Sequence, residues 1–415
     1  MKNNLFVMNK LLKLLPVFFY ALYSYAQPYD LLLKNGRLID PKNRINSKMD
    51  IAIKEGKIAR VHKSISPNLS KKSIDIKGLI VSPGFIDLHT HVFVGSDTDK
   101  FANGINSISP DDFTLRAGIT TVVDAGTSGW KNFSLFKSQV IDKSKTRILA
   151  FLNIAGYGMT GNEMQEDIME MNVDSALNCI IRNSAHIVGV KIGHFEKKDW
   201  APFDRAIDLA NKSNSPLFVE CHLPEYTLEE QLAKMRPGDI ITHTFEKVKE
   251  RASIIDENGI VRPYVLNAKN KGILFDLGHG GAGFWFSEAI PALRQGFAPN
   301  SFGTDMHRFS INAGMKDMLN VMSKFMALGL SIEDVIARAT WFPAVGIKRP
   351  ELGNLSEGAI ADIAILSRRK GKFGYIDAGG NKVYGNSKLE AELTIKNGIV
   401  VWDLNGLNAK EFTTK

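Results

Sequence analysis

The chain has 415 residues, of which 44% are hydrophobic and 23% are charged, and its formal net charge is +8. This length exceeds what one small core requires and suits one large domain with a smaller one. No basic run with interleaved aromatic residues occurs in the sequence, so the positive charge does not indicate a nucleic-acid-binding protein. With only two cysteines, the chain is not a disulfide-rich scaffold.

The first 26 residues have the pattern of a secretory signal peptide. Three lysines form a basic start, residues 11–26 are mostly apolar, and Ser24 and Ala26 are the small residues of a cleavage site. The alternative is an uncleaved membrane anchor, but the apolar stretch is shorter than the ~20 residues of a spanning helix and contains Pro16. We therefore expect an exported protein, periplasmic or secreted, without a stable membrane anchor after removal of the signal.

Short strand-like segments flank a central region at both ends of the mature chain. In 27–82 they are separated by the turn signals Asn35-Gly36 and Glu55-Gly56, and a similar pattern returns in 346–415. Because chain ends often lie close together in space, we expect these two flanks to pair into one small β-sandwich domain.

Eight apolar runs alternate with helical patterns between the flanks, in 83–345. Runs that are rich in β-branched residues and lack polar alternation suit a fully buried parallel sheet. Eight of them with intervening helices predict an α/β fold of the (β/α)8 TIM barrel type, whose active site lies at the carboxyl ends of the strands. The runs are 85–91, 120–124, 148–153, 186–191, 216–222, 239–243, 273–276 and 301–305.

Two helices are expected near the end of the barrel region. Residues 315–326 carry methionine, leucine and phenylalanine at helical spacing, which is typical of a face that packs on the core. Ser331 and Asp334 have the spacing of a helix start, and the helix that follows should stop near Pro343.

Side chains that can bind metal ions stand at the ends of the apolar runs. His89 and His91 close the first run, and two residues of a strand at this spacing point to the same face. Later runs end in Lys191, His222, His243 and Asp305. One such histidine is more often structural than a ligand. Six suitable residues at strand ends instead predict a metal centre at the mouth of the barrel.

Lys191 leaves two interpretations open. Its ammonium group could form a buried ion pair with a carboxylate. Alternatively, its amine could have reacted with carbon dioxide to form a carbamate, an anion whose two oxygens can bridge two metal ions. Two such ions activate a bridging water. Asp305 would then ligate one ion and accept the proton of the attacking water.

The six residues, together with the split β flanks, resemble the amidohydrolase superfamily. The segments Phe275-Asp-Leu-Gly-His-Gly280 and Gly303-Thr-Asp-Met-His307 resemble in particular its deacetylase-type, dihydroorotase-like metallohydrolases. The resemblance implies two divalent metal ions, usually zinc, and hydrolysis of an amide, cyclic amide or ester bond of a small molecule by a metal-bridging hydroxide. It also implies which side chains hold the ions: His89, His91 and Asp305 the first, His222 and His243 the second, with N6-carboxylated Lys191 between them.

Two positions depart from well-known members of this superfamily. Dihydroorotases carry an arginine two residues after the paired histidines, where this chain has Phe93, so dihydroorotate is not the expected substrate. D-aminoacylases use a bridging cysteine from an earlier strand, whereas the second run of this chain ends in Asp124-Ala125-Gly126.

Other residues are candidates for contact with the substrate. His279 lies among glycines and could polarise the substrate carbonyl, with a structural role as the equal alternative. Tyr157 could donate a hydrogen bond to an oxyanion. The sequence does not fix the roles of three further residues near the strand ends, which are His194, His307 and Arg308.

Two other functions stay open at this point. The same centre could support a phosphotriesterase-like or lactonase activity, or the chain could be a non-catalytic binding protein that retains the barrel. The substrate and the choice between amide and ester depend on loop residues, for which no code can be read. A homo-oligomer is compatible with this type of barrel.

Overall fold

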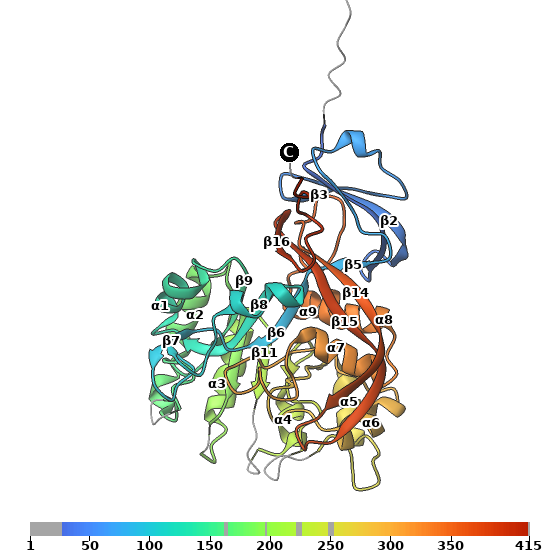
Figure 1. Ribbon diagram of the computed structural model, residues 1–415. Coiled ribbons are helices and arrows are strands. Elements are labelled where there is room, and N and C mark those ends of the chain that lie inside the picture. Colours follow the sequence, from blue (N-terminus) through green and yellow to red (C-terminus); the bar gives the residue numbers. More distant parts are fainter. Residues whose placement is uncertain (1–26, 162–164, 196, 221–225, 248–252, 414–415) are drawn as a thin grey trace, which may run out of the picture.

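The computed structural model describes residues 27–161, 165–195, 197–220, 226–247 and 253–413. The predicted signal segment 1–26 lies outside these ranges. The strands form two separate sheets, one parallel and one mixed, and helices surround the parallel sheet (Figure 1).

The parallel sheet has seven strands that are neighbours in chain order. All of its pairings are parallel. Its strands are β6 (Phe85–Thr90), β8 (Ile119–Gly129), β9 (Arg147–Asn153), β10 (Ile187–Gly193), β11 (Leu217–Glu220), β12 (Ile240–Ile241) and β13 (Leu274–Phe275). The order of strands predicted from the sequence is confirmed, although β12 and β13 are much shorter than the apolar runs.

The segment 301–306, which contains the predicted eighth strand 301–305, contacts both edges of this sheet. On one side, the amide groups of Leu277 and His279 donate to the carbonyl groups of Ser301 and Gly303. On the other side, the His91 amide donates to the Met306 carbonyl at 2.9 Å. The sheet is therefore curled, so that β6 and β13 both lie within reach of one short segment.

Nine α-helices lie in the described part of the chain, most of them between the strands of the parallel sheet. They are α1 (Phe133–Phe136), α2 (Val173–Arg182), α3 (Ala201–Lys212), α4 (Leu228–Lys234), α5 (Pro263–Lys271), α6 (Phe286–Arg294), α7 (Met318–Ala327), α8 (Ile332–Ala339) and α9 (Trp341–Gly346). Five short helices of other types complete the set: Pro67–Leu69, Pro110–Asp112, Leu115–Ala117, Lys137–Ile141 and Ile168–Glu170. None of the described helices has both the length and the apolar character needed to span a bilayer.

Helices α7 and α8 match the predicted helices with small differences at their ends. The buried methionines and Phe325 of α7 face the core, as expected, but the helix begins after Asp317, whose side chain accepts from the Asn320 amide. Ser331 caps α8 as predicted. The expected stop at Pro343 is wrong, because α8 ends at Ala339 and Pro343 lies in the first turn of α9. Proline is tolerated there, since the first amide groups of a helix have no partner within it.

The mixed sheet contains strands from both ends of the chain, as the sequence predicts. Its eight strands are β1 (Leu31–Asp40), β2 (Ile45–Lys54), β3 (Lys57–His62), β4 (Ser73–Asp75), β5 (Ile80–Pro83), β14 (Ile363–Ile376), β15 (Lys382–Lys396) and β16 (Ile399–Asp403). β5 from the first flank pairs antiparallel with β14 from the second. A further short strand, β7 (Val94–Asp97), lies outside both sheets.

The mixed sheet is one continuous hydrogen-bonded sheet that curls around its own core. β3 is the last strand of the sheet order, yet the Ile58 amide donates to the Ala359 carbonyl at 2.8 Å, just before β14. Isoleucine and leucine side chains of β1, β2, β14 and β15 form one buried cluster. The predicted sandwich domain thus takes the form of a single curled sheet in the described residues.

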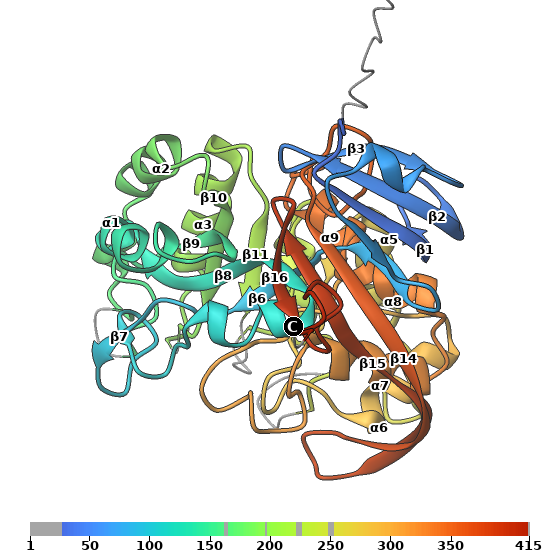
Figure 2. The same ribbon diagram turned by 45° about the horizontal axis from the view of Figure 1, so that its top comes forward.

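The long hairpin of β14 and β15 joins the two halves of the molecule. It leaves the mixed sheet and runs alongside α7 (Figures 1 and 2). The Leu389 amide on β15 donates to the Ser323 hydroxyl on α7 at 2.9 Å. At the other end of β14, the carboxylate of Asp362 accepts from Arg147, at the start of β9, and from Lys396. These polar contacts fix the flanking sheet against the parallel sheet.

Candidate metal centre

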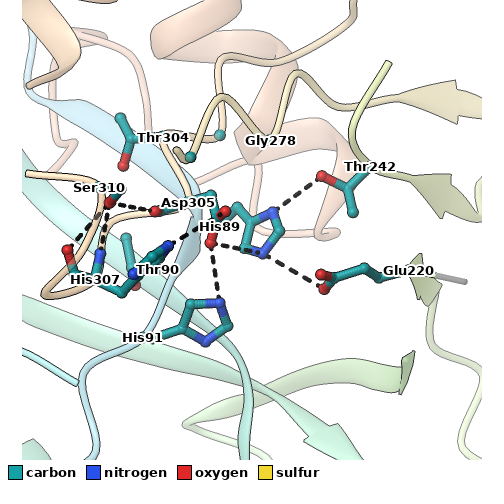
Figure 3. Close-up of polar contacts among 12 residues, drawn as sticks. His89, Thr90, His91, Glu220, Thr242, Gly278, Thr304, Asp305, His307 and Ser310 are labelled. Carbon is teal, nitrogen blue, oxygen red and sulfur yellow. Dashed lines mark hydrogen bonds and ion pairs between the residues drawn. The ribbon is translucent and has the colours of Figure 1, made fainter. Parts of the chain in front are cut away.

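Residues from the two edges of the parallel sheet form the first group of candidate metal ligands, which we call the first ligand group: His89, His91 and Asp305. His89 and His91 lie at the end of β6, and Asp305 lies in the segment 301–306 (Figure 3). The Asp305 Oδ1 atom lies 3.5 Å from His89 Nε2 and 3.1 Å from His91 Nε2. Two imidazoles and a carboxylate are a common donor set for zinc and similar ions.

A second ligand group overlaps the first and consists of His89, Glu220 and His243. Glu220 ends β11, and its Oε1 atom lies 3.0 Å from His243 Nε2. Its Oε2 atom lies 3.7 Å from His89 Nε2. Within each group, one ligand atom from every residue lies within 4.8 Å of the others. The predicted ligands His89, His91, His243 and Asp305 therefore do come together, and Glu220 joins them.

The imidazole of His89 is oriented by a chain of hydrogen bonds. Its Nδ1 atom lies 2.9 Å from the Thr242 hydroxyl, which donates to Asp276 at 2.9 Å. Burial lowers the pKa of His89 to about 4, so the ring is neutral at neutral pH. The proton is then on Nδ1, and the lone pair of Nε2 faces the centre without a hydrogen-bond partner among the described residues.

His243 is oriented in a similar way by the backbone. Its Nδ1 atom lies 2.7 Å from the Gly278 carbonyl, so Nδ1–H donates and Nε2 faces Glu220. Burial opposes the charged ring, but the carboxylates of Glu220 and Glu246 raise the pKa of His243 to about 9. Metal-binding histidines are usually held through their second ring nitrogen, as His89 and His243 are here. The donor set and its orientation therefore fit divalent ions.

The backbone around the centre is strained. Asp305, His243 and His194 all have a left-handed φ, of 52°, 56° and 55°. Such a φ costs a residue other than glycine about 1–3 kcal/mol and is concentrated at functional sites. Close packing adds a constraint, because a Cβ atom on Gly280 would clash with Asp305 Oδ2.

The carboxylate of Asp305 is ionised in this environment. Burial acts to raise its pKa, but the imidazoles of His89 and His307 hold that pKa well below its usual range. His307 Nε2 lies 3.7 Å from Asp305 Oδ2. The position of His307 is thus compatible with a role in orienting Asp305.

Lys191 is fully buried at the centre, on β10. Its Nζ atom contacts the Glu220 carboxylate and lies 4.8 Å above the Phe218 ring. The ion pair that the sequence left open as an alternative is the contact present in the structure, and carboxylation of Lys191 stays a prediction. The Lys191 side chain packs closely against the backbone of Gly126, because a Cβ atom on Gly126 would clash with Lys191 Cγ.

His222, the predicted ligand of the fifth run, lies outside the described residues. Glu220 is absent from the predicted ligands, because the apolar run continues in the sequence to His222. A signal for Glu220 does exist in the sequence, because a glutamate inside an otherwise apolar buried strand needs a partner.

His279 lies beside the centre with both ring nitrogens engaged. Its Nδ1 atom lies 3.1 Å from the Gly280 carbonyl, and its Nε2 atom 2.5 Å from Lys324 Nζ. Lys324, on α7, also donates to the carbonyl groups of Gly314 and Ile376. Burial lowers the pKa of Lys324 to about 7. Polarisation of a substrate carbonyl by His279 stays a prediction, and this geometry favours the structural alternative.

The remaining candidates differ in their distance from the centre. His194 Nε2 lies 3.0 Å from Glu220 Oε1. Tyr157 packs its ring under Lys131 Nζ at 4.7 Å, and none of its contacts in the described residues joins it to either ligand group. The Arg308 side chain is exposed. The oxyanion role of Tyr157 stays a prediction.

A cavity of about 330 Å³ lies next to the two ligand groups. It is bordered by His194, which contacts Glu220, and by Phe101, whose ring lies 4.9 Å from that of His91. Its lining consists of Asp99, Lys100, Phe101, Met159, Gly161, Gln165, Glu166 and His194. The size suits a small molecule, and the mixture of apolar and charged groups is typical of a ligand pocket.

Comparisons with known proteins show the family to which the chain belongs. No family model matches the sequence. A deacetylase of Brucella anthropi is 35% identical over 320 residues, which cover 75% of this chain and 77% of the relative. A deacetylase of Agrobacterium fabrum is 34% identical over 333 residues, covering 78% and 80%. The crystal structure of an adenine deaminase superposes with a TM-score of 0.83 at 29% identity, over 91% of this chain and 100% of that chain. The chain therefore belongs to the amidohydrolase superfamily and, within it, to the deacetylase-type metallohydrolases.

Proposed function

We propose that the protein is a hydrolase that uses two divalent metal ions to remove an acyl group from a nitrogen or oxygen atom of a small molecule. The observation that carries this proposal is the pair of overlapping ligand groups beside a cavity of about 330 Å³. Relatives named deacetylase, at 35% and 34% identity, support the acyl group as the part that is removed.

In this proposal the barrel is closed, with the segment 301–306 as its eighth strand. The bridges of Ser301 to Asp276 and of Met306 to Thr90 support closure. His89, His91 and Asp305 would hold the first ion. His243 would hold the second, together with N6-carboxylated Lys191. Zinc suits both sites, because imidazole and carboxylate are its usual ligands in hydrolases.

Two ions at this centre would supply an activated water and polarise the substrate carbonyl. The protein groups then move protons and hold the substrate. Asp305 is ionised, and its Oδ1 atom lies 3.5 Å from Nε2 of His89, which belongs to both ligand groups, so it can accept the proton of the attacking water and pass it to the leaving group. His307 would keep Asp305 in position.

A phosphotriesterase-like or lactonase activity is the first alternative, since the same centre could attack a phosphoryl or lactone group. A non-catalytic binding protein is the second. A scaffold without turnover has no need for an ionised Asp305 in a strained backbone, and this feature favours an enzyme.

The first test is an activity screen of the metal-loaded protein against N-acetyl amino acids, acylated hydroxy acids and cyclic ureides, with a phosphotriester and a lactone as comparison. We expect hydrolysis in one of the first three classes. Removal of metal by a chelator should abolish it, and added zinc should restore it. Activity that survives chelation would contradict the metal-dependent mechanism, and the absence of turnover with bound metal would favour a binding protein.

Asp305→Asn tests the proton transfer. Because the amide keeps an oxygen ligand but cannot accept the proton, we expect kcat to fall by about 100-fold or more while bound metal per chain is largely retained. Kinetics and metal analysis on one sample measure both. Asp142→Asn, an exposed aspartate paired with Lys137, is the control and should leave kcat unchanged. A normal rate for Asp305→Asn would exclude the residue as proton acceptor.

Lys191→Ala tests the bridging carbamate. We expect almost complete loss of activity, with partial rescue by a short carboxylic acid such as acetate, because the acid could occupy the place of the carbamate. Initial rates with and without the acid provide the measurement. The control is Lys269→Ala, which removes a half-buried lysine of α5 that donates to the Ala298 carbonyl, and it should show no response to the acid. Full activity of Lys191→Ala would refute the bridge.

We also propose that the protein is exported, on the basis of the signal pattern in residues 1–26. Amino-terminal sequencing of the mature protein should then begin at Gln27. A variant that lacks residues 2–26 should remain in the cytoplasm. An unprocessed chain in the wild type would overturn this proposal.

A further inference from the structure

We infer that Glu220 is a metal ligand that β11 supplies to the second ion. This inference rests on the proposed metal-dependent function. It adds to that site a carboxylate that the resemblance to the superfamily did not imply. The geometry that carries it lies entirely within the described residues.

The Glu220 carboxylate is buried among nitrogen atoms. Only 4% of the residue is exposed. Its Oε1 atom lies 3.0 Å from His194 Nε2 and 3.0 Å from His243 Nε2. Its Oε2 atom contacts Lys191 Nζ and lies 3.7 Å from His89 Nε2. The carboxylate of Glu220 thus lies next to nitrogen atoms of four residues, which are His194, His243, Lys191 and His89.

Three atoms of the second ligand group converge on one point. His243 donates its Nδ1 proton to the Gly278 carbonyl, so its Nε2 atom is directed at Glu220 Oε1, 3.0 Å away. Either a proton on Nε2 or a metal ion can lie between these two atoms. His89 Nε2, a buried atom without a hydrogen-bond partner among the described residues, lies 3.7 Å from Oε2 of the same carboxylate. A proton on His243 leaves His89 Nε2 without a partner, whereas a metal ion can bind the two nitrogen atoms and the carboxylate at once.

The strand geometry places Glu220 on the inner face of the sheet. Side chains two residues apart on a strand share a face. Phe218, two residues before Glu220, contacts the ring of His89 at 5.2 Å and lies under Lys191 Nζ. Glu220 is the last residue of β11 and points to the same interior (Figure 3). β11 therefore already delivers a ligand to the centre at its final described position.

A carboxylate at this position changes the expected metal preference. Oxygen ligands favour magnesium and manganese, whereas imidazole favours zinc and other late transition metals. The second site would hold its ion with a larger share of oxygen atoms than a site built on two imidazoles. We therefore expect manganese to compete with zinc better in the wild type than in a Glu220→His variant.

The experiment measures metal bound to the full-length protein. Wild type and Glu220→Gln are stripped with a chelator, reloaded separately with zinc and with manganese, and assayed for metal per chain. The cobalt-loaded forms give an electronic spectrum as a second readout of ligand type. We expect Glu220→Gln to lose one of two equivalents, with affinity lowered by about 100-fold.

Two further variants test whether the loss of metal is specific to the carboxylate of Glu220. Glu246→Gln is the matched control, because Glu246 is also buried and raises the pKa of His243 but belongs to neither ligand group. It should keep both equivalents. Glu220→His keeps a metal-binding side chain at the strand end, so it should also keep both equivalents and shift the preference toward zinc. This second variant remains informative if Glu220→Gln does not fold.

A folded Glu220→Gln variant that retains both equivalents would overturn the inference, because it would show that a proton and not a metal ion separates Glu220 from His243. A wild-type protein that binds no metal after reloading would instead overturn the proposed function, and the inference would fall with it.

Discussion

The arrangement of the centre depends on the hydrogen bonds that one buried carboxylate, that of Asp276, accepts. This carboxylate accepts hydrogen bonds from the Ser301 hydroxyl and the Gly303 amide at 2.5 and 2.8 Å, and from the Gly278 amide at 3.1 Å. It also accepts from Thr242, whose hydroxyl receives the Nδ1 proton of His89. One carboxylate therefore links the last strands of the sheet to the tautomer of a ligand on the first strand. Two other buried aspartates, Asp87 and Asp124, bind neighbouring strand ends in the same manner.

The flanking sheet also takes part in this organisation. The β14–β15 hairpin runs along α7, and Lys324 connects the two to the loop that carries His279. Lys324 has no carboxylate partner within 4 Å among the described residues, and its ammonium lies against two carbonyl groups, an imidazole and the Phe284 ring. A buried lysine of this kind is costly, so the loop after β13 and the hairpin are held together by a contact that permits few substitutions.

The order of strands and most of the candidate ligands could be predicted from the sequence, because both follow from simple periodicities. Apolar runs indicate buried parallel strands, and the carboxyl ends of such strands lie at the same face of the sheet. His89, His91, His243 and Asp305 were found in this way. The prediction did not include Glu220, because it placed the ligand of this strand at the end of the apolar run, at His222, which lies outside the described residues. The contacts that bring Glu220 into the second ligand group come from Lys191 and His243, which lie in other segments and are not encoded in the local sequence.

Contacts between segments that lie far apart in the chain could not be predicted from the sequence either. Thr242 and Asp276 orient His89 across more than 150 residues of chain, and nothing in the local sequence of β6 indicates them. The same holds for Lys324 on α7, whose amine is buried and contacts His279, although nothing in the local sequence of the helix indicates it.

The fit between Gly126 and Lys191 limits how such a centre can change during evolution. The aliphatic stem of the lysine fills the volume that any side chain at position 126 would need. A side chain on β8 at position 126 and the lysine stem from β10 therefore compete for one volume. Replacement of Gly126 by a residue with a side chain requires a compensating change at position 191.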